Sequence, residues 1–596
     1  MGLRVLATTD IHMQLLGFNY VLDRPSASPG LAGLATLIGN ARKEAAAAQM
    51  ACILIDNGDL LQGSELDTAL TEHPVSASHP IVACLSHLGY DTIGLGNHDL
   101  DHGLDYLGAV AATLPMPVVA TNLSIRNGGA IRSRALLEVP RLGSAKDTAR
   151  APRIGILSVL PEATAIWNQE HLRGKATVLP AKESLEREIA ALRTDGADIV
   201  VLLAHMGIEG PESAESYTDD ARSLLSVPGI DAVISGHTHR RLPGDDHTGY
   251  RDVDTVRGML GTRPAVMPGF NASDLAVIDL SLSWQRDGGW RVTEHETALR
   301  RNWNNTLPDP AILRFCETAH LQTRAALAQP CGHNGQTIHN FFSLAVPTTT
   351  CALVACAKHR LISRGLEGRP EAALPLLATA AAHTAGGRGG PGHFLHLPPG
   401  PIFRRHLAAL SPYANVICAL AVSGADLRHW LENSASVFQQ LQPGDNDQPL
   451  LQPQRPAFDF DTIFGIDYTI DPTQRRGQRI GSIRYKGVPV ADRDKFILAT
   501  NVFRAAGGGG GWRYAEGDVV LRSNTGLETA LTGLLAGNGF PFALSAKPWR
   551  FSCAQTVKAV IRSAPDSLKY LREINHLSPQ PLGTDAEGFT RIRLTL

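Results

Sequence analysis

Five short apolar runs in the first part of the chain each lead directly into side chains that bind divalent metals in proteins. The runs lie at 3–8, 51–55, 91–95, 197–204 and 231–235. Their length and their Val, Ile and Leu content predict buried strands, and a sixth strand is predicted at 264–267. Helical spacing of apolar residues predicts helices at 30–50 and 183–196. This alternation favours a layered α/β fold.

The side chains after these strands form one chemically consistent set. They are Asp10 and His12, then Asp59, then Asn97 with His98, then His205, and finally His237 and His239. Because open α/β sheets bind ligands at the carboxyl ends of their strands, we expect these groups to converge. Carboxylate, imidazole and amide ligands suit Zn²⁺, Mn²⁺ or Fe without a thiolate. Two such ions about 3.5–4 Å apart would hold the attacking and leaving oxygens of a phosphoryl displacement, with Asp59 as the bridging carboxylate.

The motifs that carry this set resemble those of the calcineurin-like metallophosphoesterases. They are D-x-H at 10–12, G-D at 58–59, G-N-H-D at 96–99, the strand-end His205 and G-H-T-H at 236–239. The resemblance implies a four-layer α/β/β/α domain with two divalent ions, of Mn, Zn, Fe or Co. It implies one ion bound by Asp10, His12, Asp59 and His239, and a second bound by Asp59, Asn97, His205 and His237. It also implies a catalytic pair, in which His98 lies near the phosphoryl group and Asp101 orients its imidazole.

The second half of the chain resembles the C-terminal domain of secreted-type nucleotidases. The resemblance lies in ALAVSGADLRHWLENSA (419–435), FDFDTIFGIDYTIDPTQ (458–474) and ILATNVFRAAGGGG (497–510). It implies an α+β nucleotide-binding domain joined by a helix to the first domain. We therefore expect a metallophosphoesterase domain at 1–300, a helical linker at 301–335, a substrate-binding domain at 336–545 and a packed C-terminal extension at 546–596. The Gly- and Pro-rich stretches at 383–401 and 441–456 are predicted to be long loops.

The choice of substrate depends on motifs early in the second domain. The G-G-G-I-R motif of the 5′-nucleotidase and UDP-sugar hydrolase branch is absent, and LPLLATAAAHTAGGRGG (374–390) stands in its place. This segment resembles the branch that hydrolyses 2′,3′-cyclic nucleotides and 3′-nucleotides. There, two aromatic rings sandwich the base, and they map to Phe458 and Phe503. The glycines at 507–511 would let backbone approach a ligand.

Two further residues of the second domain have open roles. Asn501 either hydrogen-bonds the base or caps the local turn, and Arg388 either contacts a ribose or phosphate oxygen or is a solvated loop arginine.

The expected function is to open 2′,3′-cyclic nucleotides to 3′-nucleotides and then to remove the 3′ phosphate. One alternative is a 5′-nucleotidase or UDP-sugar hydrolase on the same scaffold. The other is a non-catalytic nucleotide-binding protein, which predicts at least one missing metal ligand. All seven predicted ligands are present in the sequence, which weighs against this last reading.

The resemblance implies small-molecule nucleotides as partners, and the composition disfavours a nucleic-acid polymer or a membrane. The net charge is −2, so no overall field would attract a nucleic-acid polymer or an anionic membrane, and no apolar run is long enough to span a bilayer. The start, MGLRVLATTDIH, shows no signal peptide, so we expect a cytoplasmic protein, with the periplasm as the alternative that the resemblance suggests. The eight cysteines are expected to be mostly buried free thiols. Nothing in the sequence predicts the oligomeric state.

Overall fold

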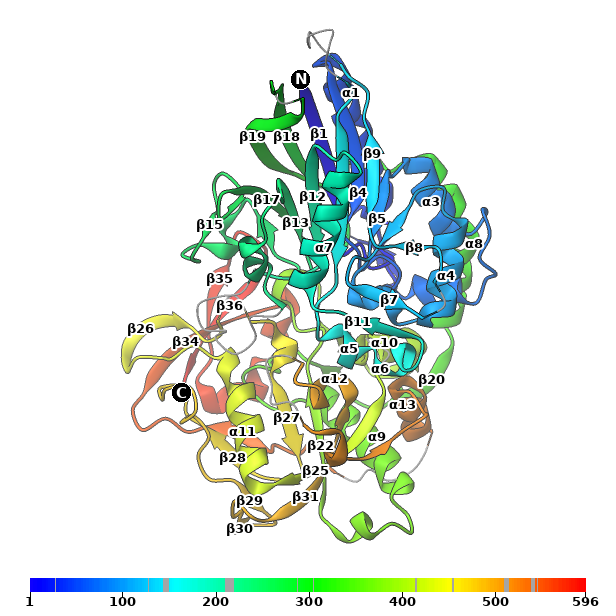
Figure 1. Cartoon of the computed structure of the whole chain (residues 1–596). Coiled ribbons are helices and arrows are strands. Elements are labelled where there is room, and N and C mark those ends of the chain that lie inside the picture. Colours follow the sequence, from blue (N-terminus) through cyan, green and yellow to red (C-terminus); the bar gives the residue numbers. More distant parts are fainter. Residues whose placement is uncertain are drawn as a thin grey trace. The chain divides into compact units, whose positions relative to one another are not determined.

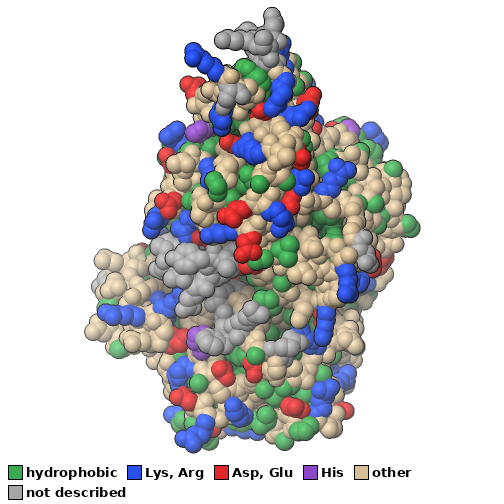
Figure 2. Space-filling view, viewed as in Figure 1, with side chains coloured by type: hydrophobic (Ala, Val, Ile, Leu, Met, Phe, Trp, Pro, Cys, Tyr) green, Lys and Arg blue, Asp and Glu red, His purple; other side chains and the backbone are tan. Residues whose placement is uncertain are grey.

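The structure is a computed structural model that describes all residues except positions 27, 127, 143–149, 209–218, 287, 304, 413–414, 453–454, 509–513, 537–541 and 544. It divides into two compact units, Met1–Ala325 and Ala326–Leu596 (Figure 1). In the described part of the chain, no helix combines the length and the apolar character needed to cross a bilayer. On the face shown in Figure 2, basic and acidic side chains are interspersed, in keeping with the small net charge.

The first unit is built on two sheets. The first sheet has the order β19 (Trp290–Arg301), β18 (Asp274–Trp284), β1 (Gly2–Thr8), β4 (Met50–Asp56), β5 (Thr92–Gly94), β6 (Val118–Val119) and β8 (Ile131–Arg132). The second has the order β15 (Val253–Asp254), β16 (Met259–Leu260), β17 (Arg263–Pro268), β13 (Ala232–Ser235), β12 (Ile199–Ala204), β10 (Arg153–Val159) and β9 (Ala135–Glu138), with β14 (Arg241–Leu242) beside β17. All six predicted strands are present.

The side chains of these strands alternate between two cores, as the pleat of a strand requires. Ile156 of β10 points into a core that both sheets share, together with Val5 of β1 and Ile278 of β18. The next residue, Leu157, points to the opposite face and packs against Leu185 of α7 (Ala181–Thr194). Helix α1 (Gly30–Ala47) contacts β1, β4 and β18 of the first sheet. The layers are therefore helix, sheet, sheet and helix, which confirms the predicted four-layer fold.

The remaining helices of the first unit are α2 (Leu66–Thr71), α3 (Pro80–Leu88), α4 (Gly103–Thr113), α5 (Thr164–Trp167), α6 (Gln169–Leu172) and α8 (Pro310–Leu327). Helix α8 lies within the segment 301–335 that was predicted to be a helical linker, and the division between the two units falls near its end. The expected boundaries at 300, 335 and 545 stay predictions.

The second unit contains a five-stranded and a four-stranded sheet. The five-stranded sheet has the order β27 (Asp461–Phe464), β22 (Leu376–Ala381), β31 (Lys495–Asn501), β25 (Ile417–Ser423) and β32 (Val519–Arg522). The helices of the second unit are α9 (Thr349–Gly365), α10 (Arg404–Leu410), α11 (Gly424–Ser434), α12 (Val502–Ala505) and α13 (Leu527–Leu535). The four-stranded sheet has the order β26 (Gly444–Pro449), β34 (Val557–Ser563), β36 (Thr590–Thr595) and β35 (Gln580–Thr584). Three of these strands, β34, β35 and β36, lie within residues 546–596.

The prediction of a loop at 441–456 is wrong in part, because this segment contains β26, which pairs with β34. The segment GDNDQP lacks the apolar alternation of a strand, so periodicity gave no signal. It is an edge strand, where polar side chains and a proline are tolerated because one side needs no partner. Likewise, the loop predicted at 383–401 contains β23 (His396–Leu397) and the start of β24 (Gly400–Phe403).

The cysteines follow the prediction for the most part. All eight are free thiols; five are buried, while Cys52, Cys331 and Cys553 are partly exposed. Cys84 of α3 and Cys316 of α8 lie with their sulfurs 3.9 Å apart and are fully buried. The sulfurs therefore fill the contact between these two helices as small apolar groups.

We predict that Ile156→Ala destabilises the first unit by about 2–5 kcal/mol, because it empties part of the core between the two sheets. Leu307→Ala is the matched control, since the Leu307 side chain is 77% exposed and should change stability by less than about 0.5 kcal/mol. Chemical denaturation followed by circular dichroism gives the free energy of unfolding. Equal losses in the two variants would contradict the shared core.

Candidate metal centre

The predicted metal ligands stand on loops that leave the carboxyl ends of neighbouring strands. β1, β4 and β5 are parallel, as are β10, β12, β13 and β17. Asp10 and His12 follow β1, Asp59 follows β4, and Asn97 begins the short 3₁₀ helix η1 (Asn97–Leu100) after β5. His205 follows β12 directly, and His237 and His239 follow β13. Parallel strands thus deliver these residues to one edge of each sheet.

Most of these ligands have an unusual backbone conformation. Five of the seven have positive φ: Asp10, His12, Asp59, His237 and His239, with φ between 49° and 66°. Residues other than glycine rarely adopt this region, and such strain gathers at functional sites. The turns fold each chain segment back as soon as its strand ends, and this brings the side chains over the sheet edge.

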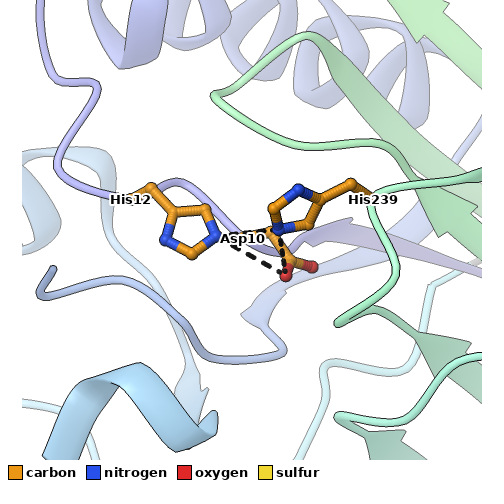
Figure 3. Close-up of side chains that lie close together, drawn as sticks. All are labelled: Asp10, His12 and His239. Carbon is orange, nitrogen blue, oxygen red and sulfur yellow. Dashed lines mark hydrogen bonds and ion pairs between the residues drawn. The ribbon is translucent and has the colours of Figure 1, made fainter. Parts of the chain in front are cut away.

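One group of candidate ligands consists of Asp10, His12 and His239 (Figure 3). The Nε2 atoms of His12 and His239 lie 2.9 Å apart, and they lie 3.8 and 3.4 Å from Asp10 Oδ1. The Nδ1–H of His12 donates to the Gln62 carbonyl at 2.8 Å, which leaves Nε2 as the lone-pair nitrogen. The three ligand atoms therefore face one point with the donors that a divalent ion needs.

A second group consists of Asp59, His205 and His237. His205 Nε2 lies 3.0 Å from Asp59 Oδ2, and His205 Nδ1–H donates to the Asn57 carbonyl at 2.8 Å. The same Asp59 oxygen lies 3.9 Å from His12 Nε2, and Asp10 Oδ1 lies 3.9 Å from His205 Nε2. The two groups are therefore adjacent, and Asp59 is within reach of both.

The residues present fit two cations. Among the described residues, Asp59 Oδ2, Asn97 Oδ1 and His205 Nε2 are buried atoms without a hydrogen-bond partner. Buried polar atoms without partners are costly in a folded protein, and all three atoms are of a kind that binds metals. The Asp59 and His205 atoms lie 3.0 Å apart, so a cation bound to both would satisfy them. The fold and these two groups support a dinuclear divalent-metal centre.

The charges around the two groups also favour cations. Burial alone would raise the pKa of Asp10, but the neighbouring His205 and His239 outweigh it and lower the pKa to about 2. Burial and the nearby His239 lower the pKa of His12 to about 4, so its imidazole is neutral at pH 7. Burial lowers the pKa of His205, yet Asp59 and Asp10 outweigh it and raise the pKa to about 10. A bound cation would take the place of that proton.

Asp99 belongs to the G-N-H-D motif, but sequence analysis gave it no role of its own, and the structure shows that it joins two of the ligand loops. Its carboxylate accepts four backbone N–H groups at 2.8–2.9 Å, those of Asp59, Leu60, Leu61 and Gly96. It thereby ties the loop after β4 to the loop after β5. Gly96 allows this close approach, because a Cβ there would lie 2.2 Å from Asp59 Oδ1.

Aromatic rings pack against two of the histidines. Phe270 stacks on His239 with ring centres 4.6 Å apart and planes inclined by 6°. Trp167 stacks on His237 with ring centres 5.5 Å apart and planes inclined by 19°. The stacked rings limit rotation of both imidazoles. No spacing in the sequence pointed to either ring, because neither lies near its histidine along the chain.

The predicted catalytic pair is brought together beside the second group. His98 Nδ1 donates to Asp101 Oδ2 at 2.7 Å, and the His98 backbone N–H donates to Asp59 Oδ1 at 2.7 Å. Burial lowers the pKa of His98, but the Asp101 and Asp59 carboxylates outweigh it and raise the pKa to about 9. Asn168 completes the arrangement, because its Nδ2 donates to Asp101 Oδ1 at 2.7 Å. Sequence reasoning missed Asn168, which lies 67 positions beyond Asp101.

The predicted base-binding residues lie in the second unit. Phe458 lies in the 3₁₀ helix η8 (Ala457–Asp459) just before β27, and Phe503 lies in α12 just after β31. Asn501 Oδ1 accepts the Arg504 backbone N–H at 2.8 Å and so caps α12, which is one of its two predicted roles. Arg388 lies in the exposed turn Gly387–Gly389. Of the predicted glycine run, positions 509–511 are outside the described residues.

Comparison with known proteins agrees with both units. Residues 3–241 match the calcineurin-like phosphoesterase family, and residues 317–516 match the 5′-nucleotidase C-terminal domain. The 2′,3′-cyclic-nucleotide 2′-phosphodiesterase/3′-nucleotidase of Salmonella typhimurium is 30% identical over 85% of this chain and 81% of its own length. The trifunctional nucleotide phosphoesterase protein YfkN of Bacillus subtilis is 28% identical over 85% of this chain, which spans only 36% of that longer protein.

A solved structure shares the fold over almost the whole length. It is a Staphylococcus aureus protein assigned as a 5′-nucleotidase, in complex with α-ketoglutarate. It is 20% identical, has a TM-score of 0.70, and covers 93% of this chain and 100% of its own. The chain therefore belongs to the nucleotidase family that joins a calcineurin-like phosphoesterase domain to a 5′-nucleotidase C-terminal domain.

Proposed function

We propose that this protein hydrolyses 2′,3′-cyclic nucleotides to 3′-nucleotides and then hydrolyses the 3′-nucleotides to nucleoside and phosphate. The observation that carries this proposal is the pair of adjacent ligand groups that share the buried Asp59, with His98 and Asp101 beside them. The activity printed in the name of the Salmonella relative supports the choice of substrate. The absence of the G-G-G-I-R motif weighs against a 5′-nucleotidase.

Seven side chains of the first unit are proposed to bind the metals. One ion would be bound by Asp10, His12, Asp59 and His239, and the other by Asp59, Asn97, His205 and His237. Mn, Zn, Fe or Co all accept such nitrogen and oxygen donors. When bound, the ions act as Lewis acids that lower the pKa of a water molecule and neutralise charge on the phosphoryl oxygens.

His98 is proposed to act on the transferring or leaving group. Its Nδ1–H is bound by Asp101, so Nε2 is the nitrogen that is available to substrate. A protonated Nε2 would donate to a phosphoryl oxygen or transfer its proton to the leaving ribose oxygen. Asp101 and Asn168 fix the ring plane, which keeps Nε2 in a constant direction during the reaction.

The two hydrolyses use the same chemistry in succession. In the first, a water oxygen forms a bond to phosphorus and the bond from phosphorus to O2′ breaks, so that the proton ends on O2′ and a 3′-nucleotide results. In the second, another water attacks and the bond from phosphorus to O3′ breaks. Both steps transfer the same phosphoryl group, so one set of groups that stabilises its charge serves both.

The second unit is proposed to recognise the base. The rings of Phe458 and Phe503 would stack on it, and such stacking contributes about 1–3 kcal/mol for each base and accepts any base. Phenylalanine has no hydroxyl group, so the two rings supply stacking without a hydrogen bond that would select one base.

We predict that 2′,3′-cAMP and 3′-AMP are hydrolysed in the presence of Mn²⁺ or Zn²⁺, and that 5′-AMP and UDP-glucose are hydrolysed at least about tenfold more slowly, a difference of about 1.4 kcal/mol in activation free energy. Chromatography of the nucleotide, nucleoside and sugar phosphate formed from each substrate, together with phosphate release, gives the comparison. A chelator should abolish all hydrolysis, and added metal should restore it. Preference for 5′-AMP, or hydrolysis that survives chelation, would contradict the proposal.

We predict that His98→Ala lowers kcat about 100-fold or more, the usual contribution of a general acid, while the protein still binds two metals. The metal content, measured by inductively coupled plasma mass spectrometry, separates the two roles. Asn168→Ala should lower kcat by a smaller factor, because it removes only one hydrogen bond to Asp101. If metal content fell together with activity in His98→Ala, His98 would be a ligand or structural residue instead.

We predict that Asp99→Asn weakens metal binding by about 10–100-fold. Both carboxylate oxygens of Asp99 accept backbone N–H groups, and in asparagine one of these oxygens becomes an NH2 group, which donates and cannot accept them. Titration with Mn²⁺ followed by calorimetry measures the affinity. Asp105→Asn is the control, since the Asp105 side chain is 96% exposed and pairs only with Lys175 among the contacts described. Unchanged affinity in Asp99→Asn would show that the loops after β4 and β5 hold their shape without this carboxylate.

A further inference from the structure

Two segments that are far apart in the sequence meet at one end of the five-stranded sheet. β22 and β31 run parallel, and β27 runs antiparallel to β22 with Asp461 opposite Ala381. The segment that enters β27 and the segment that leaves β31 therefore lie at the same end of the sheet. Phe458 belongs to the first segment and Phe503 to the second. The spacing of the two rings must be set by contacts between the segments, because 44 residues separate them along the chain.

The side chain of Arg504 makes these contacts. Its Nη2 donates to the carbonyl oxygen of Phe458, and its Nη1 donates to the carbonyl oxygen of Gly508 at 2.9 Å. The guanidinium is buried, with Arg504 only 8% exposed. One planar group thus joins the backbone that carries Phe458 to the backbone that follows Phe503.

The Gly508 contact also bears on the Phe503 ring. A Cβ at Gly508 would lie 2.4 Å from atoms of this ring, so the ring packs directly on the Gly508 backbone. The guanidinium carbon of Arg504 lies 5.7 Å from the centre of the same ring. Arg504 therefore fixes the surface on which Phe503 rests. The second ring, that of Phe458, stacks on His383 with ring centres 6.2 Å apart.

Two buried carboxylates hold the guanidinium in place. Arg504 Nε lies 3.2 Å from Asp461 Oδ2, and Nη1 lies 3.7 Å from Asp459 Oδ1. Trp430 Nε1 donates to Asp461 Oδ2 at 3.1 Å, so this carboxylate is itself fixed. The planar fork of an arginine has five N–H donors on three nitrogens and can bind two carbonyls and two carboxylates at once, whereas the three N–H donors of a lysine ammonium all lie on one nitrogen.

We propose that Arg504 is the positioning residue that sets the distance and the angle between Phe458 and Phe503, so that one planar base fits between them. The inference rests on the proposed function, because it presumes that these rings hold the base. Arg504 itself touches neither base nor phosphate in this proposal. Its removal should change how well a substrate with a base is bound, and it should leave the chemical step as it is.

The test compares substrates with and without a base. The full-length protein with Mn²⁺ is assayed with 2′,3′-cAMP and with bis(4-nitrophenyl) phosphate, which has no base. For Arg504→Lys and Arg504→Met we expect KM for 2′,3′-cAMP to rise about tenfold, which is within the range for losing stacking on a base, with kcat within about twofold. Both constants for bis(4-nitrophenyl) phosphate should stay within about twofold of the original protein.

Arg479→Lys and Arg479→Met are the matched controls for damage to the second unit. Arg479 is 3% exposed and donates from Nη1 to the carbonyls of Ala435 and Phe438 at 2.8 and 2.9 Å. It binds backbone in the same way, and its described hydrogen bonds go to residues outside the two ring segments. Thermal unfolding of all variants shows which pairs lose similar stability. If the Arg479 variants raise KM for 2′,3′-cAMP as much as Arg504 variants of equal stability, the proposal is overturned.

Other outcomes distinguish a failure of the role proposed for Arg504 from a failure of the proposed function. If the original protein hydrolyses 2′,3′-cAMP, and Phe458→Ala and Phe503→Ala both raise its KM while the Arg504 variants do not, only the role of Arg504 is wrong. If Phe458→Ala and Phe503→Ala leave KM unchanged, the base is held elsewhere, and both base recognition and the role of Arg504 are overturned. A KM that rises in the ring variants and in the Arg504 variants alike supports the proposal.

Discussion

The buried carboxylate of Asp59 is the constraint on which the arrangement of the first unit depends. Its Oδ2 atom lies 3.0 Å from His205 and 3.9 Å from His12, and its Oδ1 accepts the backbone N–H of His98. A second buried carboxylate, Asp10, lies close enough that the charge of Asp59 by itself would raise the pKa of Asp10. Two anions out of water are stable only with compensating positive charge, so the fold presents histidines and space for cations between them. The five strand-end loops can be understood as the frame for this charge balance.

Buried polar side chains that join separate segments occur in both units. Asp99 gathers backbone N–H groups from two loops, Asn168 reaches across to Asp101, and Arg504 joins the segments of Phe458 and Phe503. In each case the joined segments lie on different strands or helices, where packing of apolar side chains alone would allow sliding. Directional hydrogen bonds remove that freedom, because they are weak unless their geometry is met.

The sequence was sufficient to predict the strands, which have runs of apolar residues, and the polar residues that follow them. Apolar runs predicted β1, β4 and β12, and the polar residues directly after them were enough to bring Asp10, Asp59 and His205 to one place. The residues that support them were not predictable in this way. Asn168 and Phe270 act through contacts with residues tens of positions away, and no local period records such a contact.

Secondary structure without apolar periodicity was missed for a related reason. β26 has the composition of a loop, and only its pairing with β34, more than 100 positions later, makes it a strand. Asn501 is an intermediate case: its residue type allowed either a hydrogen bond to the base or a cap of the local turn, and the structure shows that its oxygen accepts the Arg504 N–H. Local chemistry thus suggested the candidates, and tertiary contacts chose between them.

The left-handed backbone at five of the proposed metal ligands has a consequence for how this centre can drift during evolution. Asp, Asn and His are the non-glycine residues that tolerate this conformation best, and they are also good donors to divalent ions. A turn tight enough to end a strand abruptly can therefore be made from the ligands themselves, without a glycine spacer. Exchange among these three types keeps both properties, whereas a β-branched replacement loses the donor and strains the turn at the same time. Neutral drift at these positions is therefore limited to a few residue types, even in a descendant that has lost its metals.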